Sequence, residues 1–120
     1  AANFASPDMV GHTGNAIASG QAISIIDHQL SKIAKEVDKL GGTLVITADH
    51  GNIEELIDSK TNTVDTRHSY YPVPFYVYGT TYKRKKCKRI KDAALSDVAP
   101  TILKLFKTKQ PKLMTGRSLL

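Results

Sequence analysis

The chain has 120 residues, of which 41% are hydrophobic and 23% charged, with one Cys and no Trp. This length suffices for one domain with a modest core, and we expect residues 1–120 to form a single domain. The lone Cys87 excludes an internal disulfide and fits a reducing, cytoplasmic setting. No apolar stretch is long enough to span a membrane, and the first residues lack the basic and apolar regions of a secretory signal peptide.

The net charge of +6 is unevenly distributed along the chain. Residues 1–82 carry five basic and nine acidic side chains, whereas residues 83–120 carry twelve basic and two acidic ones. Seven of the basic residues lie between Lys83 and Lys91, with no acidic or aromatic residue among them. Such a run is compatible with binding to nucleic acid phosphates. The lack of interleaved aromatic residues favours a solvated loop between a strand and a helix instead.

Apolar residues recur every three or four positions from about Asn15 to Leu40, which predicts an amphipathic α-helix. Gly41 and Gly42 are expected to end this helix, because a glycine at that position readily adopts the left-handed conformation. The predicted inward face consists of Ile23, Ile26, Leu30, Ile33, Val37 and Leu40.

Three segments are predicted to be strands: a short one at Asn3 to Ala5, one at Thr43 to Ala48 and one at Val73 to Tyr78. The run at Thr43 to Ala48 is apolar without alternation, which is typical of a strand covered on both faces. A helix between the first two strands implies a right-handed crossover and parallel pairing.

The sequence signals for the remaining elements are weaker. The polar segment 53–71 predicts an irregular connection with a short helical start at Glu54 and Glu55. Ser96 is a good N-cap, so we expect a helix from there through about Phe106, with Pro100 tolerated in its first turn.

Acidic and histidine side chains occur where predicted strands meet loops. Asp8 and His12 follow the first strand, Asp49 and His50 follow the second, and the loop before the third carries His68 to the same edge. Since parallel strands end at one edge of a sheet, these five side chains are expected to converge. Oxygen and nitrogen ligands without Cys suit a divalent ion such as Mn²⁺ or Zn²⁺, and two such ions are compatible with five ligands.

Five segments of the chain, in order, carry a resemblance to a known family. They are Asn3–Gly14, Ile46–Asn52, His68 with Pro72–Phe75, Asp97–Leu103 and Met114–Leu119. These segments resemble successive motifs of the cofactor-independent phosphoglycerate mutases, which belong to the alkaline phosphatase superfamily. The resemblance implies an α/β fold, part of an alkaline phosphatase-like three-layer sandwich with a mostly parallel sheet and helices on both faces. Residues 1–120 would be the carboxyl-terminal fragment of its metal-binding domain.

The resemblance also implies a function. Enzymes of this family are cytoplasmic glycolytic isomerases that interconvert 3-phosphoglycerate and 2-phosphoglycerate through a phosphoserine intermediate at two Mn²⁺ ions. Zn²⁺ or another divalent ion is an alternative. By motif, Asp8, His12 and His68 would bind one metal ion, and Asp49 with His50 would provide part of the shell of the other. Carboxylates would offset the charge of the cations, and neutral imidazoles would complete the shells.

The family's nucleophilic serine and its substrate-binding arginines have no counterpart in this chain. We therefore expect no catalytic residue here and no turnover of phosphoglycerate by the isolated chain. The full-length enzyme is expected to be a monomer without membrane or nucleic acid partners, whereas exposed strand edges favour self-association of the isolated chain. Two alternatives remain open: a phosphopentomutase or metal-dependent phosphatase of the same superfamily, and a basic nucleic-acid-binding module built on residues 83–91.

Overall fold

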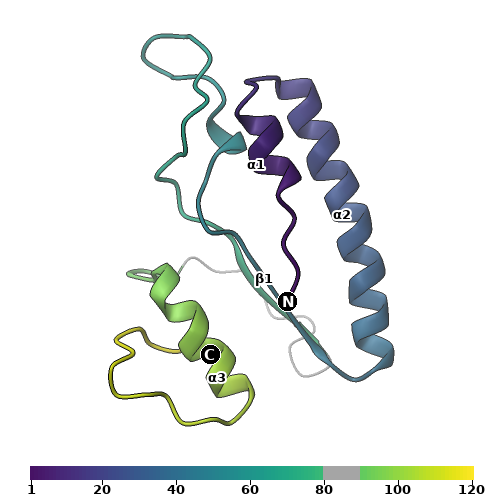
Figure 1. Cartoon of the computed structure of the whole chain (residues 1–120), viewed down its shortest axis with the longest axis vertical. Helices are drawn as coiled ribbons and strands as arrows, with labels where there is room; N and C mark the ends of the chain where they lie inside the picture. Colours follow the sequence, from purple (N-terminus) through teal and green to yellow (C-terminus); the bar gives the residue numbers. More distant parts are fainter. Residues whose placement is uncertain (80–89) are drawn as a thin grey trace. The chain divides into compact units, whose positions relative to one another are not determined.

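The computed structural model describes residues 1–79 and 90–120. The chain divides into two compact units, Ala1–Lys85 and Lys86–Leu120. Cys87 and most of the basic run, from Lys83 to Arg89, lie outside the described residues. The first unit contains α1 (Ser6–Gly11), α2 (Ala16–Lys39), β1 (Thr43–Thr47), the 3₁₀ helix η1 (Ile53–Glu55) and β2 (Phe75–Gly79), and the second contains the 3₁₀ helix η2 (Leu95–Asp97) and α3 (Val98–Leu105) (Figure 1).

A short helix follows the amino-terminal residues where a strand was predicted. Residues 1–5 have no regular secondary structure, and α1 begins directly after them. Pro7 lies in the first turn, where its missing N–H costs no hydrogen bond, and Asp8 in the same turn faces the positive end of the helix. The prediction of a strand at Asn3 to Ala5 was wrong, since these residues pair with no strand of the described chain.

The long helix α2 lies within one residue of its predicted bounds. The Asn15 side chain caps its amino end by accepting a hydrogen bond from the backbone N–H of Ala18 (3.0 Å). At the other end Gly41 has a φ of +64°, as predicted for a closing glycine. The N–H of Gly41 donates to the carbonyl of Asp38 (3.1 Å) and that of Gly42 to Val37 (2.9 Å), which is a Schellman motif.

The buried face of α2 is rotated relative to the predicted one. Ser19 and Ala22 are buried, and the half-buried apolar residues that agree with the prediction are Ile26, Leu30, Ile33 and Val37. Ile23 and Leu40, which were predicted to point inward, are 45% and 84% exposed. The helix contacts α1, β1 and β2, so its buried face is determined by these three elements and not by hydrophobicity alone.

The strands β1 and β2 pair in antiparallel fashion, in a register that runs from Thr43↔Gly79 to Thr47↔Phe75. This is the only sheet within residues 1–79 and 90–120, and the predicted parallel pairing with residues 3–5 is absent because those residues form no strand. Leu44, Val45 and Ile46 are only half-buried. The prediction that this strand is covered on both faces was therefore wrong. Figure 1 shows α2 running beside the β1–β2 ribbon, which gives the α/β arrangement expected from the sequence.

The antiparallel pairing explains why distant residues share one end of the ribbon. The carboxyl end of β1 lies next to the amino end of β2. The connection between them contains η1, as predicted around Glu54 and Glu55. Two isolated bridges, Gly51↔Ser69 and Ile57↔Val64, draw its two halves together. His50 and His68 are therefore brought to the same end of the first unit.

In the second unit, α3 starts later than predicted and Ser96 is not its N-cap. Asp97 instead organises the start: its carboxylate accepts hydrogen bonds from the backbone N–H groups of Ala94 (3.0 Å) and Arg117 (2.8 Å). These two bonds lower the pKa of Asp97 despite its burial. Pro100 lies in the first turn of α3, as predicted, and is buried.

Large side chains are rarely buried completely in the described part of the chain. Apart from Pro100, the buried hydrophobic side chains among the described residues are Ala22 and Leu56, which both belong to the first unit. Among the described helices, none combines the length and apolar character needed to cross a bilayer.

The glycine at the end of α2 provides a stability test with a matched control. Gly41→Ala forces a Cβ into the left-handed region and should lower the free energy of unfolding by about 1–2 kcal/mol. Gly20→Ala, within α2 and with no atom within 4 Å of the added Cβ, should raise it by about 0.5–1 kcal/mol. Urea unfolding followed by circular dichroism measures both changes; equal shifts of the same sign would contradict the role of Gly41.

Candidate metal centre

Helix α1 places Asp8 and His12 on one face. They are four residues apart, and the Oδ1 atom of Asp8 lies 3.3 Å from Nε2 of His12. The Nδ1 atom of His12 lies 2.7 Å from the carbonyl oxygen of Thr66. Because a carbonyl only accepts hydrogen bonds, Nδ1 must carry the proton of a neutral ring. Nε2 of that ring then keeps a lone pair directed toward Asp8, as in a metal-binding histidine.

His68 completes a triangle of possible ligand atoms. Its Nε2 atom lies 3.2 Å from Oδ1 of Asp8 and 3.2 Å from Nε2 of His12. A tetrahedral metal ion with bonds of about 2.0–2.1 Å has ligand atoms about 3.3 Å apart. The three atoms therefore have the spacing that a single divalent cation requires.

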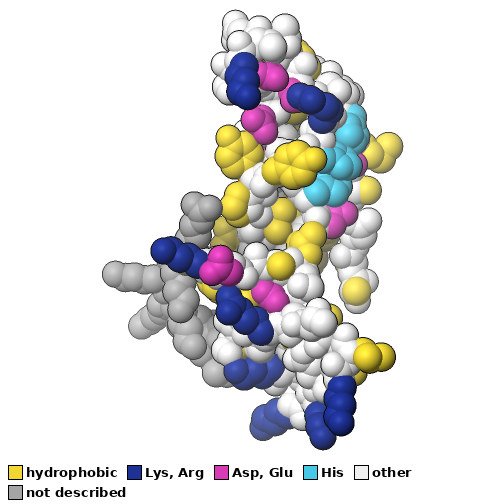
Figure 2. All heavy atoms as spheres, turned by 90° about the vertical axis from the view of Figure 1, so that its left-hand side faces the viewer, with side chains coloured by type: hydrophobic (Ala, Val, Ile, Leu, Met, Phe, Trp, Pro, Cys, Tyr) yellow, Lys and Arg dark blue, Asp and Glu magenta, His cyan; other side chains and the backbone are white. Residues whose placement is uncertain are grey.

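His50 adjoins this triangle. Its ring stacks on that of His68, with centroids 3.6 Å apart and an interplanar angle of 16°. Asp8, His50 and His68 each offer a ligand atom, and these atoms lie within 4.8 Å of one another. Histidine side chains form a visible patch on the surface of this unit (Figure 2). Four of the five predicted residues thus lie in one cluster.

Asp49 is the fifth predicted residue and lies at the margin of the cluster. Its side chain is 89% exposed, and its Oδ2 atom lies 3.7 Å from Nε2 of His50. It follows β1 directly, as expected, but its carboxylate is directed mostly to solvent. The cluster therefore consists of Asp8, His12, His50 and His68, with Asp49 attached through His50.

Asn52 is a site residue to which the sequence analysis gave no role. It is 6% exposed, and its Nδ2 atom donates a hydrogen bond to Oδ1 of Asp8 (2.9 Å). Gly11 makes room for it, since a Cβ there would overlap the Asn52 side chain. Burial alone would raise the pKa of Asp8. The hydrogen bond from Asn52 and the nearby histidines lower it by more, so the net pKa is lowered and the carboxylate form is favoured.

Glu54 and Ser69 are further residues whose roles the sequence analysis missed. The hydroxyl of Ser69 donates to the carboxylate of Glu54, and the backbone N–H of Asn52 donates to the same carboxylate (2.9 Å). Both residues are close in sequence to predicted ligands, and that proximity is the one signal that pointed to them. For Glu54 the sequence indicated only a short helical start.

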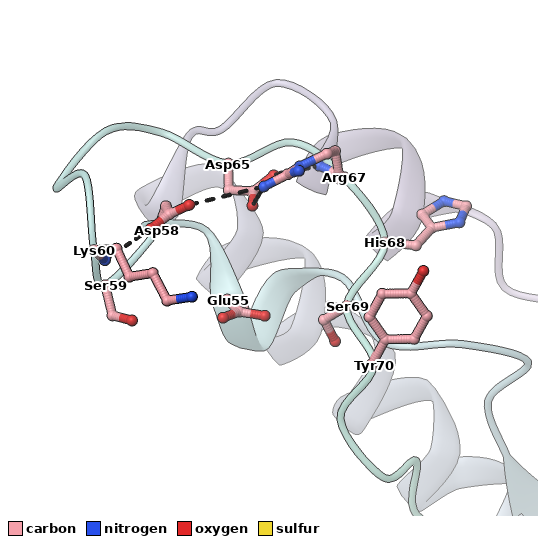
Figure 3. Close-up of a pocket in the computed structure, with 9 residues that line it drawn as sticks. All are labelled: Glu55, Asp58, Ser59, Lys60, Asp65, Arg67, His68, Ser69 and Tyr70. Carbon is pink, nitrogen blue, oxygen red and sulfur yellow. Dashed lines mark hydrogen bonds and ion pairs between the residues drawn. The ribbon is translucent and has the colours of Figure 1, made fainter.

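A groove of about 350 Å³ lies beside His68 (Figure 3). It is lined by Glu55, Asp58, Ser59, Lys60, Asp65, Arg67, His68, Ser69 and Tyr70. The Arg67 guanidinium donates to both carboxylate oxygens of Asp65, at 2.9 and 2.7 Å. These hydrogen bonds lower the pKa of Asp65 to about 2. The pair fixes the backbone just before His68.

The sequence is similar to known proteins of one family. Residues 1–110 match the Metalloenzyme superfamily. Over 118 residues the chain is 46% identical to the 2,3-bisphosphoglycerate-independent phosphoglycerate mutase of Clostridioides difficile (strain 630) and 49% identical to that of Ehrlichia canis (strain Jake). Each match covers 98% of this chain but 23% of the relative. The chain therefore spans about a quarter of the length of these relatives.

The fold is similar to a solved structure described as Leishmania mexicana phosphoglycerate mutase at low cobalt concentration. The TM-score is 0.79 with 29% sequence identity, and the match covers 96% of this chain and 23% of the other. This likeness confirms the predicted α/β, alkaline phosphatase-like fold and the family resemblance of the sequence motifs.

The Asp65–Arg67 pair makes a pH-dependent prediction. The folded-state pKa of Asp65, about 2, lies below its ordinary 3.8. The stabilising effect of the Asp65–Arg67 pair is therefore complete above about pH 4 and is lost as the pH falls toward 2. Arg67→Gln should move the Asp65 midpoint up toward 3.8, as measured by carboxyl ¹³C NMR. Lys60→Gln, which removes another cation of the groove, should leave it in place. A midpoint unaffected by Arg67→Gln would contradict this account.

Proposed function

The chain belongs to the Metalloenzyme superfamily, and we propose that it is the part of a phosphoglycerate mutase that supplies most of its metal ligands. The observation that carries this proposal is the triangle formed by Asp8, His12 and His68, with sides of 3.2–3.3 Å. Its spacing and its mixture of one carboxylate with two imidazoles suit a divalent cation. The identity to named mutases of 46–49% supports the same assignment.

In this proposal the ligands divide into two sets. Asp8, His12 and His68 hold one Mn²⁺, and Asp49 with His50 provides part of the shell of a second. Carboxylates favour Mn²⁺, and imidazoles accept both Mn²⁺ and Zn²⁺. Bound cations would stabilise negative charge on a transferring phosphoryl group and lower the pKa of the attacking hydroxyl. The residues of this chain contribute the geometry: the carbonyl of Thr66 fixes the proton of His12, and Asn52 fixes the carboxylate of Asp8.

The proposed reaction is the interconversion of 3-phosphoglycerate and 2-phosphoglycerate through a phosphoserine, in the cytoplasm. None of the described residues is assigned as the nucleophile, because Ser69, the serine beside the histidine cluster, donates its hydroxyl to Glu54. The chain therefore contributes metal ligands and their supports. The carboxyl-terminal placement of residues 1–120 within a phosphatase-like domain belongs to the same proposal.

A chimera tests the proposed activity directly. This chain replaces the matching 118-residue segment of the Clostridioides difficile mutase, and formation of 2-phosphoglycerate is followed by coupling to enolase. We expect Mn²⁺-dependent mutase activity, reduced at least 100-fold by Asp8→Ala because a charged ligand is lost. A folded chimera that binds Mn²⁺ and only releases inorganic phosphate would indicate a phosphatase site instead.

Metal binding by the chain itself is a second test. Titration with MnCl₂, followed by the electron paramagnetic resonance of free Mn²⁺, should show a binding event that weakens as the pH falls and imidazoles protonate. Asp8→Ala combined with His12→Ala should abolish it. The matched control is Asp27→Ala with His28→Ala, a neighbouring acidic and histidine pair that is exposed on α2. Unchanged stoichiometry in the first double variant would overturn the ligand assignment.

A further inference from the structure

We propose that Glu54 is a positioning residue of the metal centre, whose carboxylate fixes the register between the β1 loop (residues 48–52) and the His68 segment (residues 66–70). Since this role concerns the ligands assigned above, it rests on the proposed function. Glu54 would touch neither metal nor substrate and would act through the residues that it holds.

The contacts of Glu54 reach both segments. Its Oε2 atom accepts a hydrogen bond from the backbone N–H of Asn52 (2.9 Å), and its Oε1 atom accepts one from the Ser69 hydroxyl. The two segments also bond directly, because the N–H of Ser69 donates to the carbonyl of Gly51 (2.9 Å). One carboxylate therefore connects the residue two positions after His50 with the residue directly after His68.

The backbone leaves space for this carboxylate. Gly51 is buried, and a Cβ on it would overlap both Oε1 of Glu54 and Oγ of Ser69. Any larger residue at position 51 would displace the carboxylate from one or both donors. The position of the Glu54 carboxylate therefore explains why residue 51 is a glycine, and this steric argument does not depend on the hydrogen bonds.

The chemistry of the contact requires a carboxylate. Both oxygens of Glu54 accept, whereas the amide of a glutamine has only one acceptor atom. Burial raises the pKa of Glu54, but hydrogen bonds from Ser69 and from the backbone N–H groups of Glu54 and Asn52 lower it overall. The side chain is therefore ionised at neutral pH and able to accept from both segments at once.

This register determines how the ligands meet. His50 and His68 stack with centroids 3.6 Å apart, and they are carried by the two segments that Glu54 joins. Asn52, whose N–H is bonded to Glu54, also orients Asp8 through its side chain. A shift between the segments would disturb the stacking of His50 on His68 and the hydrogen bond to Asp8 together.

The test compares Glu54→Gln with Glu55→Gln in the 120-residue chain. Both remove one negative charge from η1. The backbone N–H of Glu55 donates to the carbonyl of Asn52 (3.1 Å), a contact that Glu55→Gln keeps, but its side chain bonds to neither segment. We expect Glu54→Gln to weaken Mn²⁺ binding by about 10- to 100-fold, as loss of a residue that orients metal ligands typically does. It should also change the visible spectrum of the Co²⁺-substituted chain, because the ligand geometry changes. Glu55→Gln should alter neither.

Ser69 provides a rescue experiment. Ser69→Ala should reproduce the effect of Glu54→Gln, whereas Ser69→Thr keeps the hydroxyl and should restore both affinity and spectrum. Urea unfolding midpoints of all variants identify any that lose binding through unfolding. If a folded Glu54→Gln chain keeps the affinity and the Co²⁺ spectrum of the unsubstituted chain, the role of Glu54 is wrong.

A measurement without metal separates this inference from the proposed function. Hydrogen exchange of the Ser69 amide, which is bonded to Gly51, should be faster in Glu54→Gln than in Glu55→Gln. Failure of the unsubstituted chain to bind Mn²⁺ would overturn the metal assignment, and the exchange rates would then decide whether Glu54 fixes the register. Equal exchange in the two variants would overturn that role.

Discussion

A single carboxylate oxygen connects the parts of the candidate site. Oδ1 of Asp8 accepts a hydrogen bond from Asn52 at 2.9 Å and lies 3.2 and 3.3 Å from the nearest nitrogens of His68 and His12. These partners come from α1, from the loop after β1 and from the segment before β2. The hydrogen bond from Asn52 to this ionised acceptor is stronger than one between neutral groups. Asp8 therefore joins three segments that no regular secondary structure connects at this end of the unit.

The rest of the first unit brings these segments to Asp8. Helix α2 carries the chain away from α1, the Schellman motif at Gly41 and Gly42 reverses it, and β1 carries it back. The antiparallel partner β2 then begins beside the end of β1. The irregular connection between the strands leaves and returns at the same place, where Glu54 joins its two ends. In this irregular connection, hydrogen bonds from side chains determine the distances between the ligands, and a ladder of strand hydrogen bonds does not.

Local sequence signals predicted the elements better than their partners. The apolar period and the glycine pair located α2 to within one residue, because both signals act within a few positions. The same period could not show which face would be buried: Ile23 and Leu40 are exposed because the contacts of α2 are made by α1, β1 and β2. Strand pairing was wrong for a similar reason, since the direction of a partner strand depends on the distant chain.

In the site, too, local signals predicted the residues but not their distant contacts. The residue types and their places after apolar runs predicted a convergence, and four of the five side chains do cluster, although residues 3–5 form no strand and α1 carries Asp8. The supports of these ligands could not be predicted. Asn52 and Asp8 are 44 residues apart, and Glu54 and Ser69 are 15 apart, so neither contact leaves a local pattern. Side-chain hydrogen bonds between loops are specified only by the folded arrangement.

These long separations have a thermodynamic consequence. The contacts of His12 with Thr66 and His68 span 54 and 56 residues. Closing loops of this length costs conformational entropy, and folding of the whole chain is what offsets that cost. The cluster therefore does not exist in the denatured ensemble. Any cation that it binds is linked to the folding equilibrium, and at a concentration a hundred times its Kd it would add about 2.7 kcal/mol to the folded state. That is a large share of the roughly 5–15 kcal/mol that holds a typical domain together.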